Sequence, residues 1–204
     1  MTQEGSFNPI VNSLSQQGYS VSEDLLSKTH IAALAGLALT RSEDGEMVQA
    51  RTGKVKTENE SLRGDSISWL DENSTDQPVI DCLATFDALR LTLNEQLFMN
   101  LHEVESHFAI YPAGAIYGKH LDQFATGPQS RQLSLVLYLN EGWLSANGGE
   151  LRLHLDGPTN DQVDISPTNG RLVLFVSSRF WHEVLPANRE RLSLTGWFRR
   201  RSLF

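Results

Sequence analysis

The stretch that decides the fold is Leu133-Ser134-Leu135-Val136-Leu137-Tyr138-Leu139, in which leucine occupies every second position. Successive side chains of a β-strand point to opposite faces of a sheet, so this spacing predicts a strand with one apolar face and one mixed face. The same two-residue period recurs at Leu151, Leu153 and Leu155. Strands are therefore expected to dominate the C-terminal half of the chain.

Short apolar segments separated by Gly, Pro and Asn lie on both sides of this stretch. Asn147-Gly148-Gly149 predicts a tight turn. The further predicted strands are 67–70, 108–111, 151–155, 163–165, 172–176, 182–185 and 192–198. About eight short strands of this kind are typical of a jelly-roll barrel.

Helices are expected in the N-terminal part. An amphipathic segment ends at Gly18, and Ser27 is placed to cap a second helix that stops near Arg41. Apolar residues at helical spacing over 79–97 predict a third helix, whose apolar stripe should pack on a sheet.

Helices followed by strands indicate a mainly β fold, a jelly-roll, cupin-like barrel buttressed by N-terminal helices. A length of 204 residues suits one domain with a sizeable core. We expect a single domain over 1–204, with helices and a loop as support in 1–100 and the β-barrel core in 101–204.

Composition limits the possible partners. Lys and Arg number 17 against 25 Asp and Glu, a net charge of −8, so a broad nucleic-acid-binding face is disfavoured. Cys82 is the single cysteine, which excludes an internal disulfide and fits a reducing compartment. No stretch approaches 18 apolar residues. We expect a cytoplasmic monomer with neither a membrane nor a nucleic-acid partner.

The strongest chemical signal is His120 and Asp122, followed by His182 and then Arg191. Two imidazoles and one carboxylate on one face, with the opposite positions open, suit a non-haem iron(II) ion. Positions 120 and 122 point to the same side if they lie on one strand. Arg191 can hold a cosubstrate carboxylate in a two-pronged grip. An enzyme is the best interpretation.

Each part of this set has a competing interpretation. His-Leu-Asp occurs a second time at 154–156, where the leucines claim the buried face; we prefer 120–122 because Gly118 permits close backbone approach before it. The competing interpretation of Arg191 is an ion pair with Glu183 or Glu190 at the surface, although the small residues around it favour a pocket. His30, His102 and His107 have no partner at ligand spacing and are expected at the surface or behind the site.

The run from about 106 to 198 resembles the iron(II)- and 2-oxoglutarate-dependent oxygenases. Within them it is most similar to the prolyl 4-hydroxylases related to those acting on hypoxia-inducible factor, and to their bacterial relatives. The matching pieces are Tyr111-Pro112, His120-Leu121-Asp122, Leu137-Tyr138-Leu139-Asn140, Gly148-Gly149-Glu150-Leu151, His182-Glu183-Val184, Arg191 through Thr195 to Trp197-Phe198, and upstream Arg63 to Trp69. Phe180-Trp181 departs from the more polar pair of the animal enzymes.

This resemblance implies a double-stranded β-helix in which His120, Asp122 and His182 bind iron(II). Arg191, helped by Tyr138, would pair with the far carboxylate of 2-oxoglutarate, and Tyr111 and Thr195 would line the same pocket. The other cosubstrate is dioxygen, with ascorbate as a supporting reductant. The implied reaction hydroxylates a prolyl residue of a protein and releases succinate and carbon dioxide. The implied partner is a protein with an exposed proline-containing loop, in bacterial relatives a translation factor.

Arg63, Asp65 and Trp197 are the candidate substrate-binding residues. The polar, glycine-bearing stretch 42–60 beside them is expected to be either a gate over a peptide or a surface loop without a role. Other classes stay open at this point. An oxygenase could act on a free amino acid or a nucleobase, and a cupin-like barrel could bind a metal, zinc included, as a sensor without turnover.

Overall fold

The computed structural model describes residues 4–50, 63–123, 131–156 and 161–201. The helices are α1 (Glu4–Gln17), α2 (Lys28–Glu43) and α3 (Gln77–Leu97), with a short 3-10 turn η2 (Ser145–Asn147). The strands are β1 (Tyr19–Ser22), β2 (Val48–Gln49), β3 (Ser66–Trp69), β4 (Glu103–Tyr111), β5 (Tyr117–His120), β6 (Arg131–Tyr138), β7 (Leu151–His154), β8 (Gln162–Ile165), β9 (Leu172–Val176), β10 (Trp181–Val184) and β11 (Arg191–Arg199).

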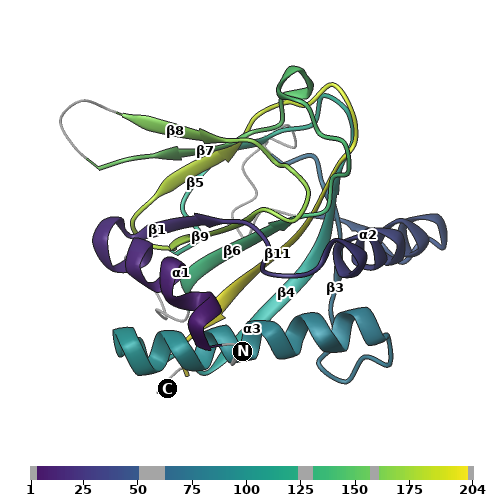
Figure 1. Cartoon of the computed structure of the whole chain (residues 1–204). Helices are drawn as coiled ribbons and strands as arrows, with labels where there is room; N and C mark the ends of the chain where they lie inside the picture. The colour runs from purple at the N-terminus through teal and green to yellow at the C-terminus, as the bar shows by residue number, and fades with distance from the viewer. Residues whose placement is uncertain (1–3, 51–62, 124–130, 157–160, 202–204) are drawn as a thin grey trace.

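The strands form two antiparallel sheets, which lie one above the other in Figure 1. The larger has the order β1-β9-β6-β11-β4-β3-β2, and the smaller has the order β5-β10-β7-β8. From β4 to β11 consecutive strands alternate between the sheets, except that β7 and β8 pair within the smaller one, as in a double-stranded β-helix. The mainly β, jelly-roll fold expected from the sequence is confirmed.

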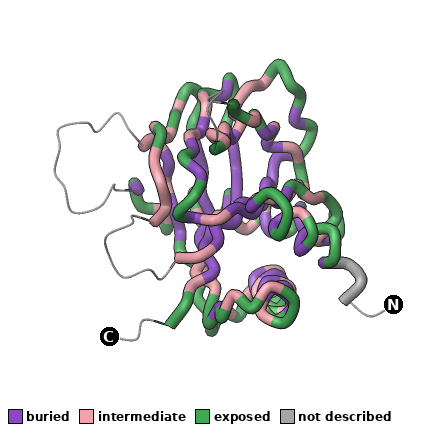
Figure 2. The backbone as a smooth tube through the Cα atoms, turned by 90° about the vertical axis from the view of Figure 1, so that its left-hand side faces the viewer, coloured by how far each residue is buried: buried purple, intermediate pink, exposed green. Residues whose placement is uncertain are grey.

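The three helices cover the outer face of the larger sheet, and Figure 2 shows buried residues concentrated between them and the strands. Each helix contributes an apolar stripe to this core, for example Leu14, Leu34 and Phe86. The strands contribute their leucine faces, including Leu135 of β6 and Leu194 of β11. Burying both sets of side chains removes a large apolar surface from water, which fixes the sheet on its helical support.

Local signals in the sequence set the helix ends as predicted. Gly18 has φ +82°, a left-handed conformation that ends α1. A residue with a Cβ would be strained in this conformation, so glycine is favoured here. The Ser27 hydroxyl accepts a hydrogen bond from the His30 backbone N–H at 3.2 Å, which caps α2. The third predicted helix is confirmed as α3.

The central strand β6 is buried on both faces. Its leucines face the helices, whereas Ser134, Val136 and Tyr138 face the smaller sheet. The mixed face that the alternation predicts is therefore the inner wall of the barrel. It is the face on which a site can be built.

Some features were not predicted. β1 pairs with β9 at the edge of the larger sheet, and β2 pairs with β3. β2, with two residues, is too short to leave a two-residue period in the sequence, and only its pairing with β9 marks β1 as a strand. The predicted gate at 42–60 is described only at 42–50, where α2 ends and β2 follows, and the rest lies outside the described residues. Among the described residues, no helix has the length and hydropathy of a membrane span.

Candidate active site

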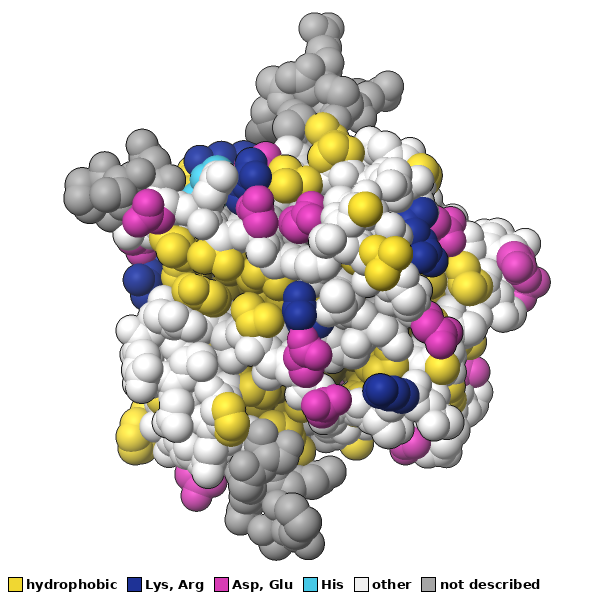
Figure 3. Space-filling view, turned by 45° about the horizontal axis from the view of Figure 1, so that its top comes forward, with side chains coloured by type: hydrophobic (Ala, Val, Ile, Leu, Met, Phe, Trp, Pro, Cys, Tyr) yellow, Lys and Arg dark blue, Asp and Glu magenta, His cyan; other side chains and the backbone are white. Residues whose placement is uncertain are grey.

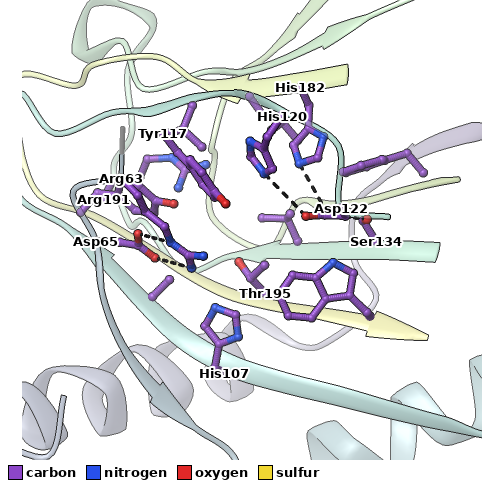
Figure 4. A pocket seen from close by; sticks show the side chains of 17 residues that line it. Arg63, Asp65, His107, Tyr117, His120, Asp122, Ser134, His182, Arg191 and Thr195 are labelled. Carbon is purple, nitrogen blue, oxygen red and sulfur yellow. Dashed lines mark hydrogen bonds and ion pairs between the residues drawn. The ribbon is translucent and has the colours of Figure 1, made fainter. Parts of the chain in front are cut away.

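A cavity lies between the two sheets, on the inner face of the larger one. It is lined by Arg63 and Asp65, which precede β3, and by residues of β4, β6, β9 and β11 on one side, and by residues of β5, β7 and β10 on the other (Figure 4). The lining residues are Arg63, Asp65, His107, Ala109, Tyr111, Tyr117, His120, Asp122, Ser134, Val136, Leu151, Phe175, His182, Val184, Arg191, Thr195 and Trp197. The cavity thus collects nearly all the residues that the sequence suggests for the site.

His120, Asp122 and His182 converge at one end of this cavity. Strands β5 and β10 pair so that His120 lies directly opposite His182. The Asp122 carboxylate oxygens lie 3.6 Å from His120 Nε2 and 3.5 Å from His182 Nε2. One difference from the prediction concerns Asp122, which lies in a bend just after β5 ends rather than on the strand. The bend still turns the carboxylate toward both imidazoles.

Hydrogen bonds fix the orientation of each member of this cluster. His120 Nδ1 lies 2.8 Å from the Gly118 carbonyl, and His182 Nδ1 lies 3.0 Å from the Phe180 carbonyl. A carbonyl can only accept, so in both rings Nδ1 carries the proton and the Nε2 lone pair faces the cluster. The Ser134 hydroxyl donates to Asp122 Oδ2 at 2.6 Å.

The electrostatic state of the cluster suits a metal. Burial lowers the pKa of His182 to about 4, so its ring is neutral at neutral pH. Burial alone would raise the pKa of Asp122, but His182, His120 and the Ser134 hydroxyl outweigh it and hold the pKa well below its usual range. Two lone pairs and a carboxylate therefore point at one another, within 4.8 Å, without a donor between them. A divalent cation is the group that satisfies all three.

Arg191 lies deep in the same cavity, with 2% of the residue exposed. Its Nε donates to the Gly149 carbonyl at 2.9 Å, and one terminal nitrogen lies 3.4 Å from the Tyr138 hydroxyl. No carboxylate of the described residues lies within ion-pair distance, so the alternative of a surface ion pair with Glu183 or Glu190 is wrong. A buried cation without an anion is costly, and it is well placed for an anionic ligand.

The surroundings of Arg191 leave room for such a ligand. Its guanidinium carbon lies 4.9 Å from the centre of the Tyr138 ring and 5.2 Å from that of Tyr111. Thr195 lies two positions beyond Ser193 on β11, with their hydroxyl oxygens 3.3 Å apart. A Cβ at Gly149 would lie 3.3 Å from Arg191 Cδ and 2.9 Å from Ala187 Cβ, so glycine at this position allows the side chains to approach closely.

A chain of contacts connects the base of the 51–62 segment to the histidine cluster. Arg63 forms a two-pronged ion pair with the fully buried Asp65, at 2.7 and 3.0 Å. The Arg63 guanidinium lies over the Tyr117 ring at 4.7 Å, and that ring is stacked on His120 at 3.7 Å. Tyr117 was not predicted as a site residue, because an aromatic residue three positions before a histidine is not a recognisable site motif. It supports one face of the His120 ring.

Trp197 and His107 complete the cavity on the side of the larger sheet. The Trp197 ring is covered by the Arg131 guanidinium, whose central carbon lies 3.5 Å from the ring centre. His107, which the sequence places at the surface or behind the site, is 1% exposed and lines the cavity itself. Its position becomes clear only from the pairing of β4 with β11, where His107 lies opposite Thr195.

The second His-Leu-Asp copy, at 154–156, contacts charged side chains outside the His120–Asp122–His182 cluster. His154 Nε2 lies 3.0 Å from a Glu183 carboxylate oxygen, and Asp156 pairs with Arg179 at 2.6 Å. Neither residue belongs to the metal-ligand cluster of the described residues. The face drawn in Figure 3 carries basic and acidic side chains interspersed.

Comparison with known proteins places this cavity in a family. The sequence profile of the 2OG-Fe(II) oxygenase superfamily matches residues 106–199, the stretch that holds the cluster and Arg191. A crystal structure of a Pseudomonas putida prolyl-4-hydroxylase is 43% identical, covers 94% of this chain and 97% of its own, and has a TM-score of 0.85. The chain belongs to the 2OG-Fe(II) oxygenase superfamily.

Two further relatives of this superfamily member are prolyl hydroxylases. One, from Trichoplax adhaerens, was solved in complex with a hypoxia-inducible factor oxygen degradation domain peptide fragment. It is 28% identical to this chain, the match covers 97% of this chain and 90% of that chain, and the TM-score is 0.85. The hypoxia-inducible factor prolyl hydroxylase of Caenorhabditis elegans is 27% identical over 95% of this chain. The chain spans 28% of that relative and 45% of the human Egl nine homolog 1.

Proposed function

We propose that this protein is an iron(II)- and 2-oxoglutarate-dependent dioxygenase that hydroxylates a prolyl residue of a protein substrate. The observation that carries the proposal is that one cavity holds both a His-Asp-His cluster without an internal donor and a buried arginine that has no carboxylate partner among the described residues. The first needs a cation and the second needs an anion. An iron ion with a dianionic cosubstrate supplies both.

In this proposal His120, Asp122 and His182 hold iron(II) and thus form the catalytic centre. The donor set fits, since two neutral imidazoles and one carboxylate on one side leave other positions open. The Gly118 and Phe180 carbonyls keep both imidazoles in the tautomer that presents Nε2. Bound iron supplies the oxidation in which 2-oxoglutarate and dioxygen become succinate and carbon dioxide and one oxygen atom enters the substrate.

The residues around Arg191 bind and orient 2-oxoglutarate. The planar guanidinium pairs with the carboxylate far from the metal, and the Tyr138 hydroxyl adds a hydrogen bond. Tyr111 and Thr195 line the same pocket. Apolar neighbours such as Val136 and Leu151 exclude water, which strengthens these charge interactions.

Arg63, Asp65 and Trp197 contact the peptide in this proposal. The preference for a prolyl target rests on the relatives whose printed names are prolyl hydroxylases. A proline-containing loop of a protein is the proposed partner, a translation factor being one candidate. The cytoplasmic location, the monomeric state and the use of ascorbate also remain proposals.

Succinate formation tests the proposal. Purified protein with iron(II), 2-oxoglutarate and dioxygen is assayed with a panel of single-proline peptides, including the hypoxia-inducible factor degradation-domain sequence. We expect one panel member to gain the mass of one oxygen atom in step with succinate, and its Pro→Ala counterpart to gain none. Oxidation of a free amino acid with all peptides unchanged would favour the alternative substrate class. Metal binding without 2-oxoglutarate turnover would favour a sensor.

A further inference from the structure

Three aromatic rings of the larger sheet, those of Trp69, His107 and Trp197, form a cluster between the surface and the cavity. Trp69 on β3 is 49% exposed, and its ring centre lies 4.8 Å from that of His107 on β4. The His107 ring lies 5.6 Å from that of Trp197 on β11. Trp69 is directly opposite His107 in the strand pairing. The His107 ring therefore packs against both indole rings, whose centres lie 6.4 Å apart.

The buried ring nitrogens of His107 and Trp197 have no hydrogen-bond partners in the part of the chain that the structure describes. Neither Nδ1 nor Nε2 of His107 has a hydrogen-bond partner among the described residues, and the same holds for Nε1 of Trp197. A buried polar atom without a partner destabilises a fold, so such atoms are rare and call for an explanation. In Figure 4 His107 lies below Thr195 and the Arg63–Asp65 pair, at the edge of the cavity.

The neighbouring polar groups are already engaged. The Arg63 guanidinium and the Asp65 carboxylate bind each other, and the Thr195 hydroxyl lies 3.3 Å from that of Ser193. Burial, aided by the charge of Arg63, lowers the pKa of His107 to about 4. The ring is therefore neutral at neutral pH and keeps one N–H donor and one acceptor. A partner has to come from the cavity side.

We propose that His107 is a substrate-binding residue that donates a hydrogen bond to a main-chain carbonyl of the peptide substrate beside the oxidised residue. This inference rests on the proposed function. The cluster contributes two N–H donors, one from His107 and one from Trp197, and neither has an acceptor among the described residues. A proline lacks an N–H but retains its carbonyl, and extended proline-bearing segments commonly bind against aromatic side chains.

The proposal is tested with His107→Leu and His107→Gln. Leucine fills a similar space without polar atoms, whereas glutamine restores a donor and an acceptor. The probe is the peptide that the wild-type protein oxidises fastest in the succinate assay. Its affinity is measured by calorimetry on zinc-loaded protein, which does not turn over, and its KM is measured beside the KM for 2-oxoglutarate.

We expect His107→Leu to weaken peptide binding about tenfold, while the KM for 2-oxoglutarate stays within about twofold of wild type. His107→Gln should return to within about threefold of wild-type affinity. The ligand-free His107→Leu protein should unfold roughly 2 to 4 °C higher, because an unpartnered buried group has been removed. His30→Leu is the control, since His30 Nε2 does have a partner, the Pro78 carbonyl at 2.8 Å. It should unfold at a lower temperature with unchanged peptide affinity.

The outcomes separate the inference from the function on which it rests. If the wild-type protein oxidises a peptide but His107→Leu binds it equally well, or if His107→Leu unfolds earlier and glutamine restores nothing, His107 is a packing residue and the inference is wrong. If the wild-type protein oxidises no peptide in the panel, the proposed function fails and the inference fails with it.

Discussion

Replacing Arg191 by methionine separates its contribution to the fold from its contribution to ligand binding. In the ligand-free protein the change removes the hydrogen bond to the Gly149 carbonyl and the contacts with the Tyr111 and Tyr138 rings. These interactions amount to about 2 to 3 kcal/mol. Opposing them is the desolvation of a buried charge without a carboxylate partner, which costs several kcal/mol. The free energy of unfolding of Arg191→Met should therefore lie within about 1 kcal/mol of wild type, or above it.

Adding 2-oxoglutarate should reveal how much ligand affinity Arg191→Met has lost. At one hundred times its dissociation constant, the ligand stabilises the wild-type protein by about 2.7 kcal/mol. For a chain of 204 residues that corresponds to a rise in the unfolding temperature of roughly 5 to 10 °C. Loss of a charge-assisted pair worth about 3 kcal/mol weakens binding roughly a hundredfold. The same ligand concentration should then raise the unfolding temperature of Arg191→Met by only about 1 °C.

Thermal unfolding of zinc-loaded protein, with and without 2-oxoglutarate, measures both quantities. Arg152→Met is the matched control, because Arg152 pairs with Asp164 on the smaller sheet and does not line the cavity. The control should keep the full ligand-induced shift. The reasoning is refuted if Arg191→Met unfolds far earlier without ligand while 2-oxoglutarate still raises its unfolding temperature as in wild type. Arg191 would then be a structural residue.

Three further predictions concern the metal, acid stability and the core. His182→Ala should weaken iron(II) binding by more than roughly 100-fold and remove turnover with little change in the fold, as measured by chelator competition and circular dichroism. The pKa of His107 is about 4 in the folded protein, against an ordinary value of 6.5, so the unfolded chain binds more protons between these two pH values. The free energy of unfolding should therefore fall as the pH drops from 6.5 to 4. In urea titrations at pH 7 and pH 4, this fall should be smaller in His107→Leu than in wild type by up to about 3 kcal/mol. Phe86→Ala, at a fully buried position of α3, should lower the free energy of unfolding by about 3 to 5 kcal/mol, and an effect below 1 kcal/mol would contradict the described core.

Local patterns in the sequence determined the elements of this fold. The two-residue period of 133–139 and the caps at Gly18 and Ser27 act within one strand or one helix turn, so they are legible without tertiary structure. The donor types of the proposed iron site, His120, Asp122 and His182, are likewise legible, because an open iron site needs those donors. The brief strands β1 and β2 were missed, since only pairing with a neighbour makes them strands.

The tertiary structure alone decided how these residues meet. Only the pairing of β5 with β10 brings His182 opposite His120, and the bend after β5 aims Asp122 at both. The burial of Arg191 depends on which segments surround it, and so does its lack of a carboxylate partner among the described residues. The same is true of the His107 ring nitrogens, which have no hydrogen-bond partner among those residues. Burial and hydrogen-bond partnership are properties of contacts between distant segments, and no local pattern encodes them. The sequence by itself therefore determined which reactive residue types the chain contains. The tertiary structure decided where the buried charges lie and which buried polar atoms have no hydrogen-bond partner among the described residues.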